Sequence, residues 1–216
     1  MSLITNWGYT LTDADSLTEL LTDTEYDHLT GSRYTEDERI QPNIRAASSA
    51  IRNYCGWHIY PSLACEWSGR LGGVSLNISA NHTRRGWELL IQLPAKFVTE
   101  VKSVVIAGEE LDSSKYFVER NGILTVHGVR PTAYQDYDQI VVRYIAGLPS
   151  GMMDGIRELA AHRVTHALAS SNGITSEAAG GVSVTYNTNW VNSARATALP
   201  DDNKEVLGPY RVQGVF

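Results

Sequence analysis

The amino-acid sequence predicts an α+β fold: a small helical bundle with an inserted antiparallel β-hairpin/sheet unit and an extended C-terminal tail. Two changes of hydrophobic period support this prediction. Apolar residues recur at helical spacing before residue 56 and again after residue 151, whereas they alternate with polar residues between residues 63 and 146. The last stretch, residues 188–216, has no sustained period. We therefore expect one domain over residues 1–187, followed by a tail.

Three helices are expected around the β unit. The first spans about residues 15–22, with Asp15 or Ser16 as its N-cap. The second spans about residues 36–55 and ends at Gly56. Its apolar stripe consists of Ile40, Ile44, Ala47, Ile51 and Tyr54. The third spans about residues 152–170, and its expected apolar face consists of Met152, Ile156, Leu159, Ala160, Val164 and Ala167.

Pro42 leaves two alternatives for the start of the second helix. If Thr35 and Glu38 form a capping box, Pro42 lies inside the helix and kinks it. If Pro42 instead occupies the first helical position, the acidic residues precede the helix.

The β unit, about residues 63–146, is expected to be antiparallel. Alternating segments over residues 74–80 and 87–93 flank a polar loop at 81–86, and further strands are expected at 101–106 and 140–144. Asn121-Gly122 is a strong signal for a two-residue hairpin turn, which would place Phe117 opposite Val126. Residues 180–186 fit one more strand.

Charge and composition exclude several functions. Hydrophobic residues make up 43% and charged residues 19% of the 216 residues, as in globular proteins. The net charge of −6 is concentrated in residues 1–40, which hold nine acids and two bases, so a DNA-gripping basic patch is not expected. No apolar run is long enough to span a membrane, and the first residues do not resemble a signal peptide. We therefore expect a protein of the cytoplasm.

The search for catalytic chemistry predicts no enzyme, no cofactor and no metal. Cys55 and Cys65 are expected to be buried free thiols. His162 and His166 lie four residues apart on a helix with Glu158 one turn earlier, but the HExxH pattern is missing, so we expect solvent-facing side chains. A small metal-dependent hydrolase that uses this pair and a carboxylate is the alternative.

Three short motifs follow one another along the chain. The first is the helix over residues 44–57, IRAASSAIRNYCGW. The second is Leu93-Pro94 leading into residues 101–106 and then the hairpin over residues 116–124. The third is VVRYIAG, residues 141–147, followed by a long helix. In this order the motifs resemble phage head–tail connector, or adaptor, proteins of long-tailed phages. The resemblance covers roughly residues 15–170, and the region after Asn172 does not follow the pattern.

This resemblance implies a structural virion protein, assembled in the host cytoplasm, that forms a twelvefold ring beneath the portal. DNA would pass through the ring, and the tail or a stopper protein would dock below it. Acidic residues facing the channel would repel DNA and let it slide. The residues expected to do so are Asp13, Asp15, Glu19 and Asp23. Another neck or tail-completion protein is the alternative.

The tail, residues 188–216, is expected to bind a partner, either the portal or a neighbouring subunit. Its side chains of interface type are Trp190, Tyr210, Arg211 and Phe216. Packing of these aromatic residues on their own domain is the alternative.

Overall fold

The chain folds into two compact units that together confirm the α+β class. The computed structural model describes residues 3–31, 37–70, 78–83, 86–129, 139–170, 176–179, 182–185 and 201–212. The β unit comprises Met1–Thr18, Cys55–Ser150 and Tyr210–Phe216, and the helical unit comprises Glu19–Tyr54 and Gly151–Pro209. The range that we expected as one domain is thus divided between two units, and the larger part of the β unit is inserted between two helices of the other unit.

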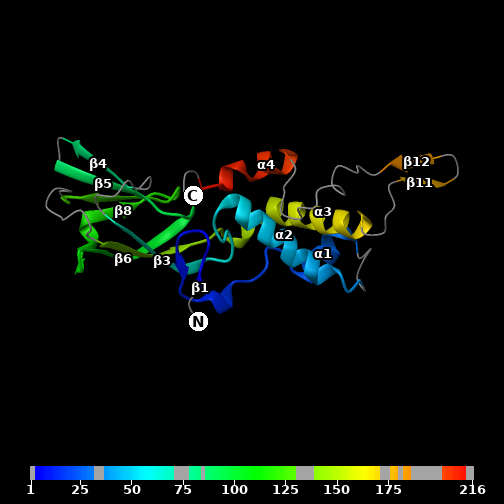
Figure 1. Ribbon diagram of the computed structural model, residues 1–216, viewed down its shortest axis with the longest axis horizontal. Helices are drawn as coiled ribbons and strands as arrows, with labels where there is room; N and C mark the ends of the chain where they lie inside the picture. The colour runs from blue at the N-terminus through cyan, green and yellow to red at the C-terminus, as the bar shows by residue number, and fades with distance from the viewer. Residues whose placement is uncertain are drawn as a thin grey trace. The chain divides into compact units, whose positions relative to one another are not determined.

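The β unit contains an antiparallel six-stranded sheet with the order β1-β2-β3-β10-β6-β7. Strands β1, β3 and β6 of this sheet are labelled in Figure 1. These strands are β1 (Leu3–Ile4), β2 (Thr10–Leu11), β3 (Leu63–Arg70), β10 (Gln139–Ala146), β6 (Val98–Ile106) and β7 (Glu109–Glu110). The central strand β10 alternates in burial, and Ile140, Val142 and Tyr144 are buried on one face. The strands predicted at 101–106 and 140–144 are confirmed, and both are longer than predicted.

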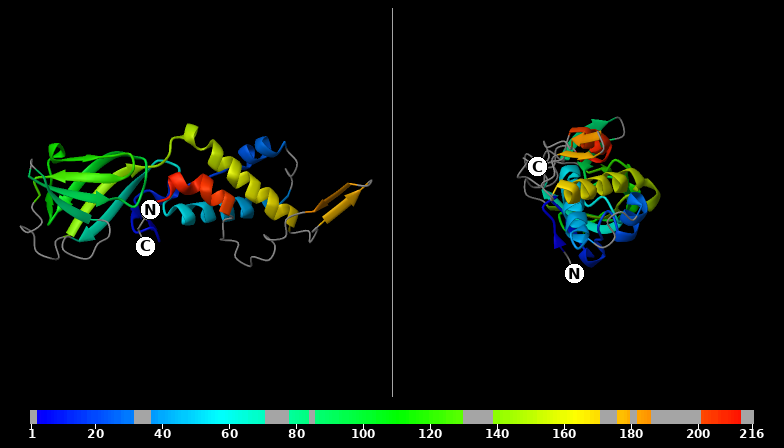
Figure 2. Two further views of the ribbon diagram at one scale, coloured as in Figure 1. Left: turned by 90° about the horizontal axis from the view of Figure 1, so that it is seen from above. Right: turned by 90° about the vertical axis from the view of Figure 1, so that its right-hand side faces the viewer.

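A second antiparallel sheet, with the order β4-β5-β9-β8, lies against the first within the β unit (Figures 1 and 2). Its strands are β4 (Ile78–Thr83), β5 (Gly86–Gln92), β9 (Ile123–His127) and β8 (Tyr116–Val118). Leu89, Ile91, Leu124 and Val126 are all buried and share the inner face of this sheet. The hairpin predicted from the alternation on either side of residues 81–86 is confirmed, although β4 continues to Thr83. Residues 74–77 of its predicted first strand lie outside the described residues.

The predicted register of the Asn121-Gly122 hairpin is wrong by one residue. Phe117 lies opposite Thr125, and Tyr116 lies opposite Val126. Of the two turn residues, only Gly122 has a positive φ, 86°. A two-residue type I′ turn needs a positive φ at both central residues, so the turn is of another type.

The connection is a three-residue loop that is closed by Glu119. The Glu119 N–H donates to the Ile123 carbonyl, and the Gly122 N–H donates to the Glu119 carbonyl, both at 2.9 Å. A side chain at Gly122 is excluded by close packing, because a Cβ atom there would lie 2.1 Å from the Ala95 carbonyl oxygen. Contacts with a segment distant in sequence therefore select this turn.

The helical unit contains four described helices and a small hairpin. The helices are α1 (Asp23–Thr30), α2 (Ile40–Cys55), α3 (Asp154–Ser170) and α4 (Asp201–Leu207). The hairpin consists of β11 (Ser176–Ala179) and β12 (Val182–Thr185), and β12 agrees with the strand expected at 180–186. Short 3-10 turns occur at Ser150–Met152 and Gly208–Tyr210, and two more in the β unit lie at Ala14–Ser16 and Ser113–Lys115. None of the helices among the described residues is long and apolar enough to cross a membrane.

The helix predicted over residues 15–22 is wrong. The chain forms a 3-10 turn at Ala14–Ser16, and α1 begins only at Asp23. Leu20 and Leu21 are fully buried, but the Leu20 N–H donates to the Ser48 hydroxyl of α2 at 3.0 Å rather than to a helical carbonyl. This tertiary contact holds the segment non-helical.

The helix predicted over residues 36–55 is α2. It begins at Ile40, so Pro42 lies in the first turn, where its missing N–H has no helical partner to lose. Thr35 of the alternative capping box lies outside the described residues. Gly56 follows the helix with a φ of 77°, in the left-handed conformation predicted for a stop.

The helix predicted over residues 152–170 is α3, which starts two residues later than expected. Met152, expected on the apolar face, is 45% exposed, whereas Met153 is buried. Leu159 and Ala167 are only half-buried. The buried face of α3 consists of Ile156, Ala160, Ala161, Val164 and Leu168, and Met153 is buried just before the helix.

The described part of the predicted extended tail, residues 201–212, is folded. Residues 201–207 form α4, and Leu207 and Val212 are 0% and 2% exposed. The Val212 N–H donates to the Cys55 carbonyl at 2.9 Å. The prediction of an extended chain fails here because two well-placed apolar side chains are enough to fix a short segment.

Candidate functional site

Thr22 and Glu25 form a capping box at the N-terminus of α1, the helix that contacts α3. The Thr22 hydroxyl oxygen accepts the Glu25 N–H at 3.2 Å, and Glu25 Oε2 accepts the Thr22 N–H at 2.8 Å. The Thr22 hydroxyl also donates to Oε2 at 2.9 Å. The Thr-x-x-Glu spacing is the sequence signal for this cap, and our sequence-based prediction missed it.

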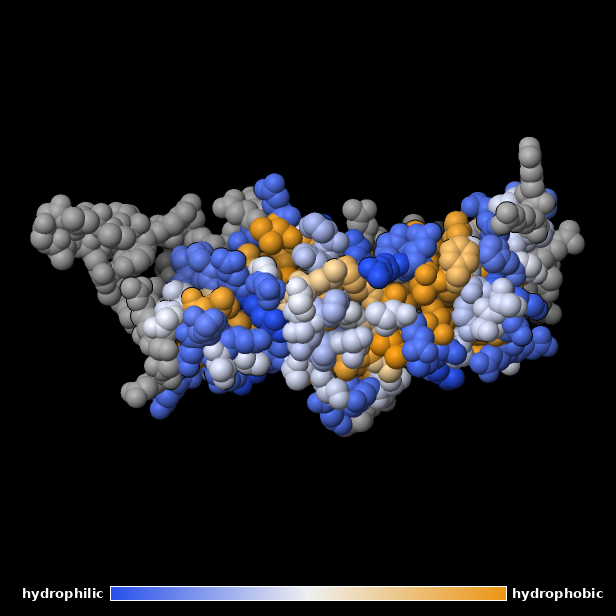
Figure 3. Space-filling model, turned by 180° about the vertical axis from the view of Figure 1, so that it is seen from behind, coloured by the Kyte–Doolittle hydropathy of each residue, from blue (hydrophilic) through white to orange (hydrophobic). Residues whose placement is uncertain are grey.

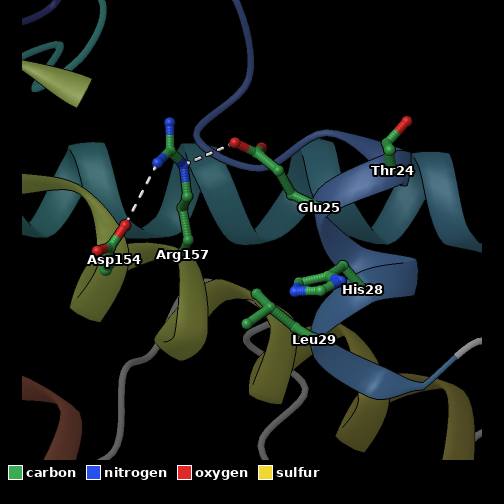
Figure 4. Close-up of a pocket in the computed structure, with 6 residues that line it drawn as sticks. All are labelled: Thr24, Glu25, His28, Leu29, Asp154 and Arg157. Carbon is green, nitrogen blue, oxygen red and sulfur yellow. Dashed lines mark ion pairs between the residues drawn. The ribbon is translucent and has the colours of Figure 1, made fainter. Parts of the chain in front are cut away.

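Arg157, which lies on α3, connects this cap of α1 to α3 (Figure 4). Its Nε lies 2.9 Å from Glu25 Oε1, and its terminal nitrogen lies 3.6 Å from Asp154 Oδ1. The Nε–H is poorly aligned for a hydrogen bond, so we treat the first contact as an ion pair. The Arg157 side chain is 15% exposed, which makes this pair less screened than a surface pair.

A hollow of about 420 Å³ lies between α1 and α3. It is lined by Thr24, Glu25, His28, Leu29, Asp154 and Arg157. Both carboxylate oxygens of Glu25 already have partners, the Thr22 N–H and Arg157. The side chain of Asp154 is 87% exposed, and Leu29 is 47% exposed.

The histidine pair of α3 does not form a metal site with other described side chains. In the described part of the chain, no group of three or more His, Cys, Asp and Glu is arranged to hold a metal ion. His162 is exposed as predicted, but His166 is half-buried, and this part of the prediction is wrong. Burial lowers the pKa of His166, and the nearby His162 and Arg163 lower it further.

The four acids predicted to line a channel are divided between the units. They are Asp13 and Asp15 in the β unit, and Glu19 and Asp23 in the helical unit. Asp13, Asp15 and Asp23 are exposed. Glu19 lies 4.0 Å from Arg52, whose side chain is only 7% exposed. The negative charge of Glu19 therefore compensates the buried positive charge of Arg52. Glu19 therefore has a structural role within its own unit.

The predicted tail residues differ in their surroundings. Tyr210 is half-buried, and its carbonyl accepts the indole N–H of Trp57 at 2.7 Å. Arg211 is exposed. Trp190 and Phe216 lie outside the described residues.

A buried polar cluster in the β unit was not predicted. His58 is fully buried, with Nε2 2.8 Å from the Ala146 carbonyl oxygen and Nδ1 2.8 Å from the Tyr9 hydroxyl. Since a carbonyl only accepts, a neutral His58 carries its proton on Nε2 and accepts the Tyr9 O–H at Nδ1. The Tyr9 oxygen in turn accepts the His58 backbone N–H at 3.0 Å. The period-two spacing of the buried residues Trp7, Tyr9 and Leu11 is the signal that was overlooked.

The two cysteines are buried free thiols, as predicted. Burial raises the pKa of both thiols to about 12. Because the thiolate is the nucleophile, both side chains are unreactive at neutral pH in the folded protein.

The described residues form an α+β protein in which the ion pairs Arg157–Glu25 and Arg52–Glu19 join segments of the helical unit. On the face seen in Figure 3, apolar patches alternate with polar ones. A family model described as "Head completion protein" matches residues 19–212. The chain therefore belongs to the head completion protein family, which confirms the resemblance to phage head–tail connector proteins. No curated protein matches the chain.

The family gives the chain a structural role in the phage particle. Head completion proteins act at the neck of the virion, where they contact other head or tail proteins. This assignment favours a structural protein over an enzyme.

Proposed function

We propose that the chain forms a ring, with twelve copies in the virion, that joins the portal to the tail and lets DNA pass through its channel. The observation that carries this proposal is the family match over residues 19–212. The contacts of Glu25, Arg157 and Glu19 support only the structural, non-catalytic part of this proposal, because these groups are used between segments of the chain itself.

The ring is tested with the purified chain, alone and mixed with its portal, by native mass spectrometry and light scattering. We expect an assembly of twelve copies on the portal. A chain that binds the portal as a single copy, or that binds only a preassembled tail, would instead support the alternative of another neck or tail-completion protein.

Exposed acids at the N-terminus support a channel that repels DNA. The double variant Asp13→Asn/Asp15→Asn keeps the fold, because both side chains are exposed, but it removes two negative charges. We expect the ring of this variant to retain DNA more strongly at low salt than the parent ring. The matched control is Glu109→Gln/Glu110→Gln, which removes two exposed charges elsewhere. Equal DNA retention by both variants would contradict a channel-lining role.

The alternative of a metal-dependent hydrolase is tested with the double variant His162→Ala/His166→Ala. We expect little change in folding and assembly, because neither side chain is fully buried. A zinc-dependent rise in the melting temperature of the parent that the double variant lacks would support the hydrolase.

We propose that the C-terminal tail contacts the portal through the residues that follow Val212 in the sequence. Since Leu207 and Val212 are buried, deletion of residues 188–216 would remove part of the core. The suitable truncation is therefore residues 213–216, which ends in Phe216. We expect this deletion to preserve the melting temperature and to weaken portal binding, whereas loss of the ring without portal would point to a neighbouring subunit.

A further inference from the structure

Among the described strands, β1 is the last at one end of the six-stranded sheet, so its outer edge is open with respect to them, and both of its residues are apolar. Ile4 is 84% exposed and Leu3 is 46% exposed. The Thr5 N–H donates inward to the Tyr9 carbonyl at 3.1 Å. Because backbone groups of successive strand residues point to opposite sides, the N–H and carbonyl of Ile4 face the open edge.

This edge is held in place by buried contacts. The hairpin of β1 and β2 contains Trp7 and Tyr9, which are 8% and 3% exposed, and the Tyr9 hydroxyl binds His58. An ordered edge binds a further strand at a lower entropic cost than a flexible one.

The other described sheet edges are less suited to an added strand. Strand β7 carries two exposed acids, Glu109 and Glu110, and charged side chains protect sheet edges. Strand β8 contacts β6 within the β unit, and its Phe117 ring stacks on His127 with centroids 5.5 Å apart. Strand β4 presents mainly polar residues.

The hairpin of β11 and β12 is a sheet of only two strands. Among the described strands, neither β11 nor β12 pairs with any other. A two-stranded hairpin alone is marginally stable in water, and a third strand stabilises it. The sequence of β12, Val182-Ser183-Val184-Thr185, alternates apolar and polar residues, as does a strand with one covered face.

We propose that β12 of one copy pairs with the open edge of β1 of the next copy, so that strand addition links the subunits of the ring. The proposal rests on the ring of the proposed function. A closed ring needs two different complementary surfaces on each copy, and the β1 edge and the β12 edge provide such a pair. Strands β1 and β12 are both labelled in Figure 1.

The first test is the variant Ile4→Pro. Proline removes the outward N–H of Ile4, and an edge strand tolerates proline where that N–H faces solvent. We expect the variant to melt like the parent and to lose ring formation. The matched control Ile4→Thr keeps the N–H and should keep at least part of the assembly. If Ile4→Pro proves unstable, cross-linking decides in its place.

The second test is a disulfide between copies. A chain that carries both Ile4→Cys and Val184→Cys is oxidised with glutathione disulfide and analysed on a non-reducing gel. The native thiols are buried and do not interfere. Head-to-tail pairing gives a ladder of dimers, trimers and larger species, whereas each single variant should stay monomeric on the gel. The pair Glu110→Cys/Val184→Cys is the control for the β7 edge.

Each outcome separates this proposal from the ring itself. Four results would overturn the strand-addition contact while the parent chain still forms a ring. They are the absence of a ladder, an equal ladder from the β7 control, dimers from Ile4→Cys alone, and a disulfide confined to the monomer. A parent chain that stays monomeric, alone and on its portal, overturns the ring of the proposed function.

Discussion

Leu207 provides a direct test of whether the C-terminal segment belongs to the core. The side chain is 0% exposed on α4, whereas its neighbour Val206 is 49% exposed on the same helix. Leu207→Ala removes a buried isobutyl group and leaves a cavity, which costs about 2–5 kcal/mol. Val206→Ala removes little buried surface, and the higher helix propensity of alanine offsets part of that loss, so we expect a change below about 0.5 kcal/mol.

The assay is urea unfolding followed by circular dichroism, with thermal melting as a second measurement. For a chain of this size, a loss of about 2–5 kcal/mol lowers the melting temperature by about 4–20 °C. If Leu207→Ala and Val206→Ala have the same small effect, α4 is not packed on the fold. If Leu207→Ala leaves the stability unchanged but weakens portal binding, the whole segment over residues 201–212 acts as a partner-binding tail.

Three further predictions concern the β unit, the buried cluster and pH. Gly122→Ala should destabilise the protein by about 1–3 kcal/mol or more in urea unfolding, because the residue has a positive φ and a Cβ atom meets a carbonyl. Gly31→Ala, at a positive φ but in open space, should cost less, and the reverse order would contradict the turn geometry. Tyr9→Phe should cost about 1–3 kcal/mol in thermal unfolding, because it leaves buried polar groups without a partner; unchanged stability would exclude the proposed tautomer network. The paired Arg39 lowers the pKa of Asp37 to about 2, so the stabilisation from this pair is present above the unfolded pKa of the carboxyl and is lost as the pH falls through about 2. In an NMR titration, Arg39→Gln should raise the pKa of Asp37 towards 3.8, and an unchanged midpoint would mean that the pair does not form in solution.

The sequence predicted the β unit best, because a strand with one covered face shows its period directly. Leu89 and Ile91 alternate with half-buried residues in β5, and Ile140 to Ala146 do so in β10. The hairpin register was not predictable from the turn residues alone. The Leu93 N–H donates to the Gly122 carbonyl and the Phe97 N–H donates to the Arg120 carbonyl, and these tertiary hydrogen bonds favour the three-residue loop.

The elements that sequence reasoning placed wrongly all depend on distant partners. Leu20 and Leu21 have the composition of a helix, but a hydrogen bond to Ser48 holds the chain away from helical geometry. Residues 201–212 contain few apolar side chains. The two buried ones, Leu207 and Val212, lie in segments that contact residues far away in sequence, α3 and Cys55 respectively. The polar cluster of His58 and Tyr9 joins positions 49 residues apart, and a local pattern does not show such a pair.

The insertion of the β unit between α2 and α3 has a consequence for the order of folding. Residues 56–153 separate these helices, which amounts to 98 residues. The inserted segment begins with β3 and ends with β10, and Leu63 lies opposite Ala146 in the register of these strands. Once the strands have paired, the two ends of the insertion are neighbours, and the loop that must close between the helices shrinks from 98 residues to about 16. At about 0.6 kcal/mol for each halving of loop length, this lowers the entropic cost of bringing α3 to α2 by about 1.5 kcal/mol. During synthesis on the ribosome, we therefore expect the sheets to form first. Helix α2 would pack against α3 only after β3 and β10 have paired and brought the two ends of the insertion together.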